Sequence, residues 1–313
     1  MKFLISTSVI ILMILLFVIC MLVVITWKLS NRILKPTSLS TKEVYEKEVL
    51  KGRLDENFFE KVKKEEFMVT SRFGYKLTGL ILSNDFTKQP ENSEKVAVLC
   101  HGYTYGKYGA ICYASILMEQ GFTCVIYDHR NHGESDKVYT TMGYYEKFDL
   151  MTVVDFCYEH FSADIKIITH GESMGAATVL SHMEIDERVT CVIADCPFSD
   201  LNALLQHQLK EYYHLPATLL LPIANLIFKI RAGFFINEVS PLQSVINTKT
   251  PVLFIHGGKD TYVPTAMTLK MYESREEAKE IYICNEAKHA QSYDFDPIKY
   301  RKEIIKFLDK YYA

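Results

Sequence analysis

Several signatures of common function classes are missing from the sequence. The net charge is −3, and no cluster of Lys and Arg interleaved with aromatic residues is present, which argues against a nucleic-acid partner. There is also no CxxC, no HExxH and no glycine fingerprint for a dinucleotide. Thiol-redox, zinc-peptidase and nicotinamide chemistry therefore lack their usual motifs, and we expect neither a metal nor an organic cofactor.

A disulfide framework is missing as well. Of the eight cysteines, Cys20 lies near the amino terminus, and the other seven are an odd number scattered without regular spacing. Such scatter is typical of reduced, mostly buried thiols.

Charge is missing from the interval between Lys2 and Lys28, and residues 9–25 are apolar without a break. At ~1.5 Å per residue this run, with residues 3–8, crosses most of a ~30 Å hydrocarbon layer. The alternative is a cleaved signal peptide, but the run exceeds the usual ~7 to 15 residues and no small-x-small site follows it. We predict that residues 1–30 form an uncleaved, single-pass transmembrane anchor.

The basic residues around this run indicate an orientation. Lys28, Arg32, Lys35 and Lys42 follow it, against Lys2 alone before it. The positive-inside rule then slightly favours a body that faces the cytoplasm, and the reduced cysteines agree. The bias is small, so the opposite side stays open.

Residues 31–66 are rich in Lys and Glu and carry apolar residues at loosely helical spacing. This pattern predicts a charged helical lead-in that separates the anchor from the body. The apolar positions are Val44, Leu50, Leu54, Phe58, Phe59 and Val62.

Residues 67–313 alternate between short apolar runs and helix-length stretches. Residues 67–71 and 75–82 read as a strand pair with a turn at Gly74. The later apolar runs are 96–100, 123–127, 165–169, 189–195, 251–255 and 280–284. This alternation predicts an α/β fold with a mostly parallel central sheet and helices on both faces, in which ligands bind at the carboxyl ends of the strands.

One interval, at about 201–248, breaks the alternation. It contains LPATLLLPIANLIF, with Pro216 and Pro222, and is too short for a second span. We predict a helical cap whose apolar face lines a substrate pocket. A peripheral helical pair and a surface that dips into the bilayer are the alternatives.

The chemistry centres on Gly171-Glu172-Ser173-Met174-Gly175, where an apolar run stops and helix-forming residues follow. A GxSxG between a strand and a helix is typical of a nucleophilic serine held on a tight, strained turn. A Cβ at Gly171 or Gly175 would collide with the facing strand or helix. The alternative is a glycine-rich turn with a capping serine.

A serine nucleophile needs a base and a carboxylate that orients the base. Asp260 follows the run at 251–255, and His289 follows the run at 280–284, so both lie on loops at the expected sheet edge. Asp195 and Asp200 are the alternative acids.

Two backbone N–H groups should stabilise the oxyanion. We assign them to Met174, directly after the nucleophile, and to Tyr103 in the loop HGYTYG after the run at 96–100. Gly106-Lys107 resembles a P-loop only faintly, because the glycine spacing is wrong and no Ser or Thr follows. Residues 128–135 are predicted to form a structural turn, since His129 and His132 lack further metal ligands at suitable spacing.

With HGYTYG, HGESMG, IHGGKDTYVP and His289, the chain resembles the α/β-hydrolase superfamily over about residues 67–312. More narrowly, it is similar to bacterial membrane-anchored hydrolases of the serine aminopeptidase-like and prolyl-oligopeptidase-like group. The resemblance implies Ser173 as nucleophile, Asp260 as acid, His289 as base and a lid between residues 200 and 251. It leaves the substrate open, because the fold hosts many activities.

The sequence therefore predicts a membrane-tethered serine hydrolase that cleaves a carboxylic ester or related acyl bond. The apolar cap and the tether favour a small acyl or lipid-like substrate. One alternative is a serine peptidase on short peptides, with Glu211 or Glu238 holding a peptide terminus. The other is a non-catalytic anchored binding protein, against which the complete set of Ser173, Asp260 and His289 argues.

Overall fold

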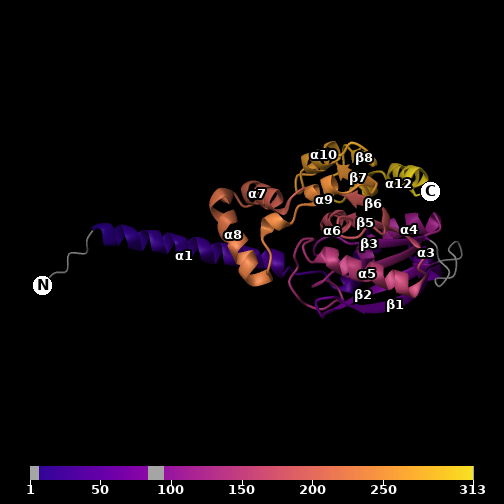
Figure 1. The fold of residues 1–313 in the computed structure, drawn as a ribbon, viewed down its shortest axis with the longest axis horizontal. Coiled ribbons are helices and arrows are strands. Elements are labelled where there is room, and N and C mark those ends of the chain that lie inside the picture. Colours follow the sequence, from indigo (N-terminus) through magenta and orange to yellow (C-terminus); the bar gives the residue numbers. More distant parts are fainter. Residues whose placement is uncertain (1–6, 84–94, 313) are drawn as a thin grey trace.

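A computed structural model describes residues 7–83 and 95–312. A long amino-terminal helix, α1 (Thr7–Leu34), projects from an α/β body (Figure 1). By length and composition α1 could cross a membrane, although a signal sequence near the amino terminus would pass the same test. Its first turns are exposed, and its buried residues are Thr26, Ser30 and Leu34.

The body is built on a central sheet, which in the described residues has eight strands in the order β1-β2-β4-β3-β5-β6-β7-β8. β1 pairs antiparallel with β2, and β2 with β4, while the other neighbours are parallel. The strands are β1 (Lys63–Thr70), β2 (Lys76–Ser83), β3 (Lys95–Cys100), β4 (Thr123–Tyr127), β5 (Lys166–Glu172), β6 (Val189–Asp195), β7 (Val252–Gly257) and β8 (Lys279–Cys284). The predicted mostly parallel sheet is confirmed, and the last residues of β3, β5 and β6 lie side by side at one edge.

Helices cover both faces of the sheet, as predicted. On one face α4 and α12 enclose a core with the lead-in, and on the other α5, α6, α9 and α10 enclose a second core. The bounds are α4 (Ile111–Glu119), α5 (Glu146–His160), α6 (Met174–His182), α9 (Pro241–Asn247), α10 (Thr265–Glu273), α11 (Ser292–Phe295) and α12 (Pro297–Tyr311), with 3₁₀ turns η2 (Lys107–Ala110) and η3 (Ile236–Glu238). Because apolar side chains meet helices on both sides, all five residues of β4 are buried.

The lead-in differs from the predicted spacer. It forms two short helices, α2 (Thr41–Leu50) and α3 (Glu56–Lys61), and β1 begins at Lys63. Val44, Leu54, Phe59 and Val62 are buried. The apolar side chains of this charged segment therefore pack on the body, while its Lys and Glu residues largely face solvent.

The cap consists of α7 (Leu201–Glu211) and α8 (Ala217–Ala232), which lie beside the end of α1 (Figure 1). α8 continues through Pro222. The last part of the predicted cap, α9, packs on the body instead, with Leu242 and Val245 in the core shared with α6. Leu34 of α1 joins Phe228 and Phe234 in an apolar cluster under the cap.

Candidate active site

Ser173 occupies the turn between β5 and α6, with φ 55° and ψ −111°. A non-glycine residue rarely adopts such a φ, which costs on the order of 1–3 kcal/mol. The Ser173 N–H holds the turn by donating to the Asp195 carbonyl oxygen at 2.8 Å. The strained strand-to-helix turn expected for this motif is therefore present.

The flanking glycines are required by close contacts. A Cβ at Gly171 would lie 2.2 Å from the Gly175 carbonyl oxygen, and one at Gly175 would lie 2.2 Å from the Cys100 carbonyl oxygen. Both obstacles are backbone atoms, so neither can move aside. The predicted collisions with the helix and with the neighbouring strand are confirmed.

Asp260 and His289 come together with Ser173 at this edge of the sheet. His289 Nε2 lies 2.9 Å from the Ser173 hydroxyl oxygen, and His289 Nδ1 lies 2.6 Å from Asp260 Oδ2. Since a carboxylate only accepts, Nδ1 carries the hydrogen and Nε2 is free to accept from the serine. This arrangement can pass the serine proton to the imidazole.

Asp260 is held in its ionised form. Although burial opposes ionisation, hydrogen bonds from His256 and His289 lower the pKa of Asp260 to about 2. His256 Nε2 donates to Oδ2 at 3.1 Å, and the N–H groups of Tyr262 and Val263 each donate to Oδ1 at 2.9 Å. His256 directly follows the apolar run at 251–255, in β7, and its role as a donor to Asp260 was not among the predictions from the sequence.

The loop after β3 brings Tyr103 to the cleft that Ser173 also lines. The Gly102 carbonyl oxygen lies 2.7 Å from His101 Nδ1, and the N–H on the same peptide points the opposite way. Among the described residues this N–H has no protein acceptor. Met174 is the first residue of α6, so its N–H has no acceptor within the helix.

Three buried histidines support this loop from behind. Thr104 N–H donates to His132 Nε2 at 3.1 Å, and His129 N–H donates to His101 Nε2 at 3.0 Å. Burial lowers the pKa of His129 to about 3 and also lowers that of His132, so these rings are neutral. Within the described ranges, no group of three or more His, Cys, Asp or Glu side chains could hold a metal ion.

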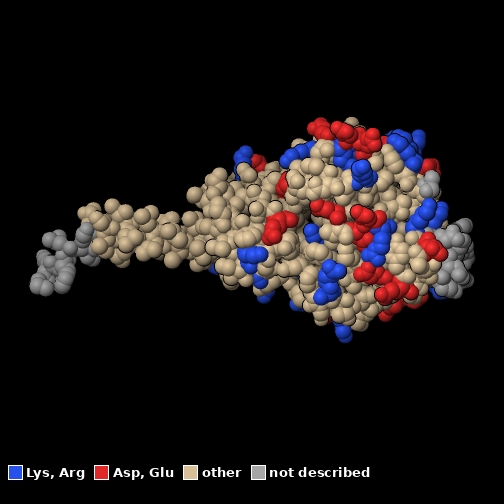
Figure 2. Space-filling view, in the orientation of Figure 1, with Lys and Arg blue, Asp and Glu red and all other residues tan. Residues whose placement is uncertain are grey.

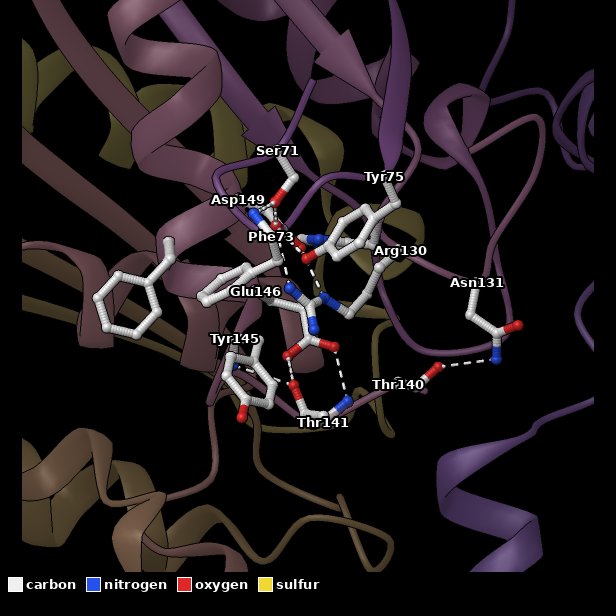
Figure 3. Close-up of polar contacts among 12 residues, drawn as sticks. Ser71, Phe73, Tyr75, Arg130, Asn131, Thr140, Thr141, Tyr145, Glu146 and Asp149 are labelled. Atoms are coloured by element: carbon white, nitrogen blue, oxygen red, sulfur yellow. Dashed lines mark hydrogen bonds and ion pairs between the residues drawn. The ribbon is translucent and has the colours of Figure 1, made fainter. Parts of the chain in front are cut away.

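The loop at 128–135 is joined to the body by Arg130. Figure 3 shows its guanidinium facing Asp149 of α5, with Nε 2.7 Å from Oδ2 and Nη2 3.0 Å from Oδ1. Ser71 and Tyr75, from the β1–β2 turn, donate to the same carboxylate. Arg130 thus ties together three segments, in keeping with the predicted structural turn.

The alternative acids lie elsewhere. Asp195 is fully buried and accepts from the Tyr300 hydroxyl at 3.0 Å, and burial raises its pKa. Asp200 accepts from the Ser240 hydroxyl at 2.6 Å. His289 therefore has Asp260 as its carboxylate partner.

Arg53 of the lead-in reaches the site, which the sequence analysis missed. Its Nη2 donates to Asp294 Oδ2 and to the Ala290 carbonyl oxygen, each at 2.7 Å. Its Nη1 lies 3.6 Å from Glu172 Oε2. An arginine in a Lys- and Glu-rich segment gives no local signal of burial, yet Arg53 is only 6% exposed.

Ser173 and His289 open into a cleft of about 410 Å³. Its other walls come from the lead-in and from the loops after β3, β7 and β8, including Lys51, Arg53, Tyr103, Tyr262 and Gln291. None of the described residues that line the cleft belongs to the predicted cap, so the expected apolar cap lining is wrong for this cleft. The Lys51 ammonium lies 3.4 Å from buried Glu48. Both cations of the cleft therefore already have carboxylate partners.

Comparisons with known proteins identify the family of the chain. A family model described as serine aminopeptidase, S33, matches residues 91–232. The uncharacterized protein YqkD of Bacillus subtilis (strain 168) is 34% identical over 282 residues, which cover 90% of each chain. The chain belongs to the α/β-hydrolase superfamily.

Solved structures share the α/β-hydrolase fold. The esterase Pf2001 of Pyrococcus furiosus matches with a TM-score of 0.65 at 22% identity, over 80% of this chain and 94% of that one. An acylaminoacyl peptidase of Pyrococcus horikoshii matches with a TM-score of 0.59 at 19% identity, over 82% of this chain and 44% of that one. At such identities the likeness establishes the fold alone. Together the comparisons identify this α/β-hydrolase as a hydrolase in general terms, with esterase and peptidase neighbours.

Proposed function

We propose that the protein is a serine hydrolase that cleaves a carboxylic ester or related acyl bond. The observation that carries the proposal is the continuous hydrogen-bonded chain from Ser173 through His289 to Asp260. His289 takes the serine proton as the hydroxyl oxygen attacks the acyl carbon. The Tyr103 and Met174 N–H groups stabilise the oxyanion that forms.

The second half of the reaction uses the same residues. His289 returns the proton to the leaving oxygen, and the acyl group stays on Ser173. Water then attacks the acyl carbon as His289 takes its proton, and the bond between the acyl carbon and the Ser173 oxygen breaks as His289 returns this proton to the serine oxygen, which releases the acid. Asp260 keeps the imidazole oriented and stabilises its protonated form in both steps. No cofactor takes part in this proposal.

An acyl or lipid-like substrate is supported by the surroundings of Ser173. The apolar cluster under the cap borders the site through Met174, Tyr103 and Val263. We further propose that α1 is retained as a single-pass anchor, with the cytoplasmic orientation slightly favoured by the basic residues after it.

A serine peptidase is the second candidate, because the matching family model carries that description. An aminopeptidase needs a free carboxylate for the substrate's amine. Glu211 pairs with Lys210 at 3.3 Å, and Glu238 accepts from the Phe235 N–H at 2.6 Å. Glu172 and Asp294, in the cleft itself, face Arg53. These pairings favour a substrate without a charged terminus.

A fluorophosphonate probe tests the proposal on detergent-solubilised protein. We expect labelling of the wild type and none of Ser173→Ala or His289→Ala, because the serine reacts only when the imidazole activates it. Asp260→Asn should label more weakly than the wild type, because the imidazole loses its carboxylate partner, whereas Asp195→Asn, which alters the rejected acid, should label like the wild type. A folded wild type that stays unlabelled would favour the non-catalytic binding protein instead. A panel of esters and peptide amides then separates esterase from peptidase.

A further inference from the structure

The last turns of α1 dock on the cap, and the preceding turns do not. Residues from Val9 to Ile19 are exposed, whereas Thr26 and Ser30 are buried. The helix from Thr7 to Ile25 is about 28 Å long at ~1.5 Å per residue, close to the ~30 Å of a hydrocarbon layer. If this part of α1 spans the membrane, the cap meets α1 where the helix leaves the hydrocarbon.

The junction carries the side chains that gather at lipid headgroups. The chain's single tryptophan, Trp27, lies there with Arg231 of α8 stacked 4.5 Å from its ring centroid. Arg231 also donates to the Ser30 hydroxyl, and Arg32 donates to the Tyr213 hydroxyl at 3.0 Å. Tryptophan, tyrosine and basic residues are the usual anchors at this depth.

α8 runs across α1 rather than along it (Figure 1). It presents Leu219, Leu226 and Ile230 to the outside, at 56%, 58% and 70% exposure. Their spacing of seven and four residues places them on one face of the helix, while Leu220 and Phe228 are buried. An apolar face on a helix that lies across a span is typical of an interfacial membrane helix.

The charge distribution agrees with this placement. Figure 2 shows charged side chains gathered on the body, while α1 and most of the adjoining cap carry few on this face. Lys229 and Arg231 stand near the end of α8, where Lys229 donates to the Gly233 carbonyl oxygen and Arg231 stacks on Trp27. Basic residues beside an apolar face are favoured next to phosphate groups.

We propose that the outer face of α8 (Leu219, Leu226 and Ile230) rests in the lipid leaflet from which α1 emerges, and that acyl substrates enter the site from this leaflet. The inference rests on the proposed function, including the retained anchor, and adds the source of the substrate. A bilayer is favoured over another protein as the occupant because the apolar face is continuous with the proposed span through the α1–α8 contact.

Contacts connect this surface to the catalytic loops. The Tyr103 hydroxyl donates to the Arg32 carbonyl oxygen of α1. On the other side of the cap, the Tyr212 hydroxyl donates to the Thr261 hydroxyl at 3.1 Å, next to Asp260. The inner face of the cap is apolar, with Leu204 and Phe228 in the cluster that reaches Met174. Apolar side chains thus connect α8 with Met174, the residue after Ser173, and the proposed entry of an acyl chain runs along this cluster.

Depth-dependent fluorescence quenching tests the proposal with the full chain in phosphatidylcholine vesicles whose acyl chains are brominated. The variant Trp27→Phe/Leu226→Trp carries its single tryptophan on the outer face of α8. The matched control Trp27→Phe/Ile298→Trp carries it on α12, at a position that is 81% exposed. We expect bromolipids to remove most of the fluorescence of the first variant and none of the second.

The wild type, with Trp27, reports insertion of α1 in the same vesicles. The proposal would be overturned if bromolipids quenched Trp27 but not the tryptophan at position 226. It would also be overturned if a second copy of the chain shielded position 226 from the bromolipids. The measurement needs no turnover, so a failure of the proposed hydrolase activity leaves its outcome unaffected.

An activity measurement tests the delivery of substrate. The variant Leu219→Gln/Leu226→Gln/Ile230→Gln should hydrolyse a long-chain ester embedded in vesicles several-fold more slowly than the wild type, while its rate on a water-soluble short-chain ester is unchanged. Equal losses on both substrates would overturn entry from the leaflet.

Discussion

Asp260 shares one carboxylate oxygen between two histidines, and this arrangement controls its charge. Oδ2 accepts hydrogen bonds from His289 Nδ1 at 2.6 Å and from His256 Nε2 at 3.1 Å, while two backbone N–H groups donate to Oδ1. A buried carboxylate without such donors would take up a proton and lose its hold on the imidazole. His256 thus positions the acid without contact to the serine.

The charge of Asp260 should appear in the pH dependence of stability. Its folded pKa of about 2 lies below the ordinary value of ~3.9. The ionised carboxylate therefore stabilises the fold fully above about pH 4, and this contribution is lost as the pH falls from ~4 towards ~2. At ~1.4 kcal/mol per pH unit, the loss is about 2 kcal/mol.

Asp260→Asn removes the titrating group. Between pH 5 and pH 2.5 the free energy of unfolding, measured in urea, should fall in both proteins. The fall should be about 2 kcal/mol larger in the wild type than in this variant. Identical pH dependence in the two proteins would show that the Asp260 pKa is not depressed.

At the scale of elements, strand ends were the informative feature. Ser173, Asp260 and His289 could be placed from the sequence because parallel strands end at one edge of a sheet, so residues after separate strands meet there. The same reasoning could not find Arg53 or His256. The partners of Arg53 lie far away in the chain. The partner of His256 is only four residues away, but neither residue type in its local setting indicates whether the side chain is solvated or paired.

The lead-in shows the limit of hydrophobic periodicity. Its apolar positions predicted helices, and the structure has two short ones there, α2 of 10 residues and α3 of 6 residues. The pattern could not show what these helices pack on, because Val44 and Phe59 would have the same spacing if the two helices packed only on each other. The boundary of the cap could not be predicted for the same reason. α9 falls inside the interval predicted as the cap, but its Val245 packs on the body with α6.

Arg53 makes the lead-in part of the active site, and its replacement tests this. Arg53→Met should lower the free energy of unfolding by about 3 kcal/mol, because it leaves Glu172 and Asp294 without their cation. The Ala290 carbonyl beside His289 also loses a donor, so kcat on a short-chain ester should fall. Thermal unfolding and steady-state kinetics measure the two effects.

Two further variants separate the role of Arg53 from a general effect of charge. Lys42→Met in the same segment breaks an exposed pair with Glu46 at 3.6 Å, which should cost at most ~0.5 kcal/mol. Arg53→Lys should restore little of the lost stability or kcat, because an ammonium group cannot donate two parallel hydrogen bonds as the planar guanidinium does. Full activity in Arg53→Met would contradict the assignment of this residue to the site.

At the scale of the whole molecule, the end of α1, the lead-in and the body pack together rather than forming a domain on a tether. Leu34 and Val44 are fully buried, and Leu54, Phe59 and Val62 are less than a tenth exposed. Burial of such side chains stabilises a fold by ~1.5–3 kcal/mol each. Their sum, about 7–15 kcal/mol as an upper bound, is as large as the net stability of a typical domain.

Two truncations should therefore behave differently. Deletion of residues 2–25 removes the apolar run but leaves Thr26, Ser30 and Leu34 on the cap, so we expect a folded protein that labels with the fluorophosphonate probe. Deletion of residues 2–62 removes the five core side chains together with Arg53, and we expect aggregation and no labelling. Circular dichroism and probe labelling of both proteins measure this difference. A folded, labelled product of the longer deletion would mean that the lead-in is a spacer after all and that the body carries its catalytic site alone.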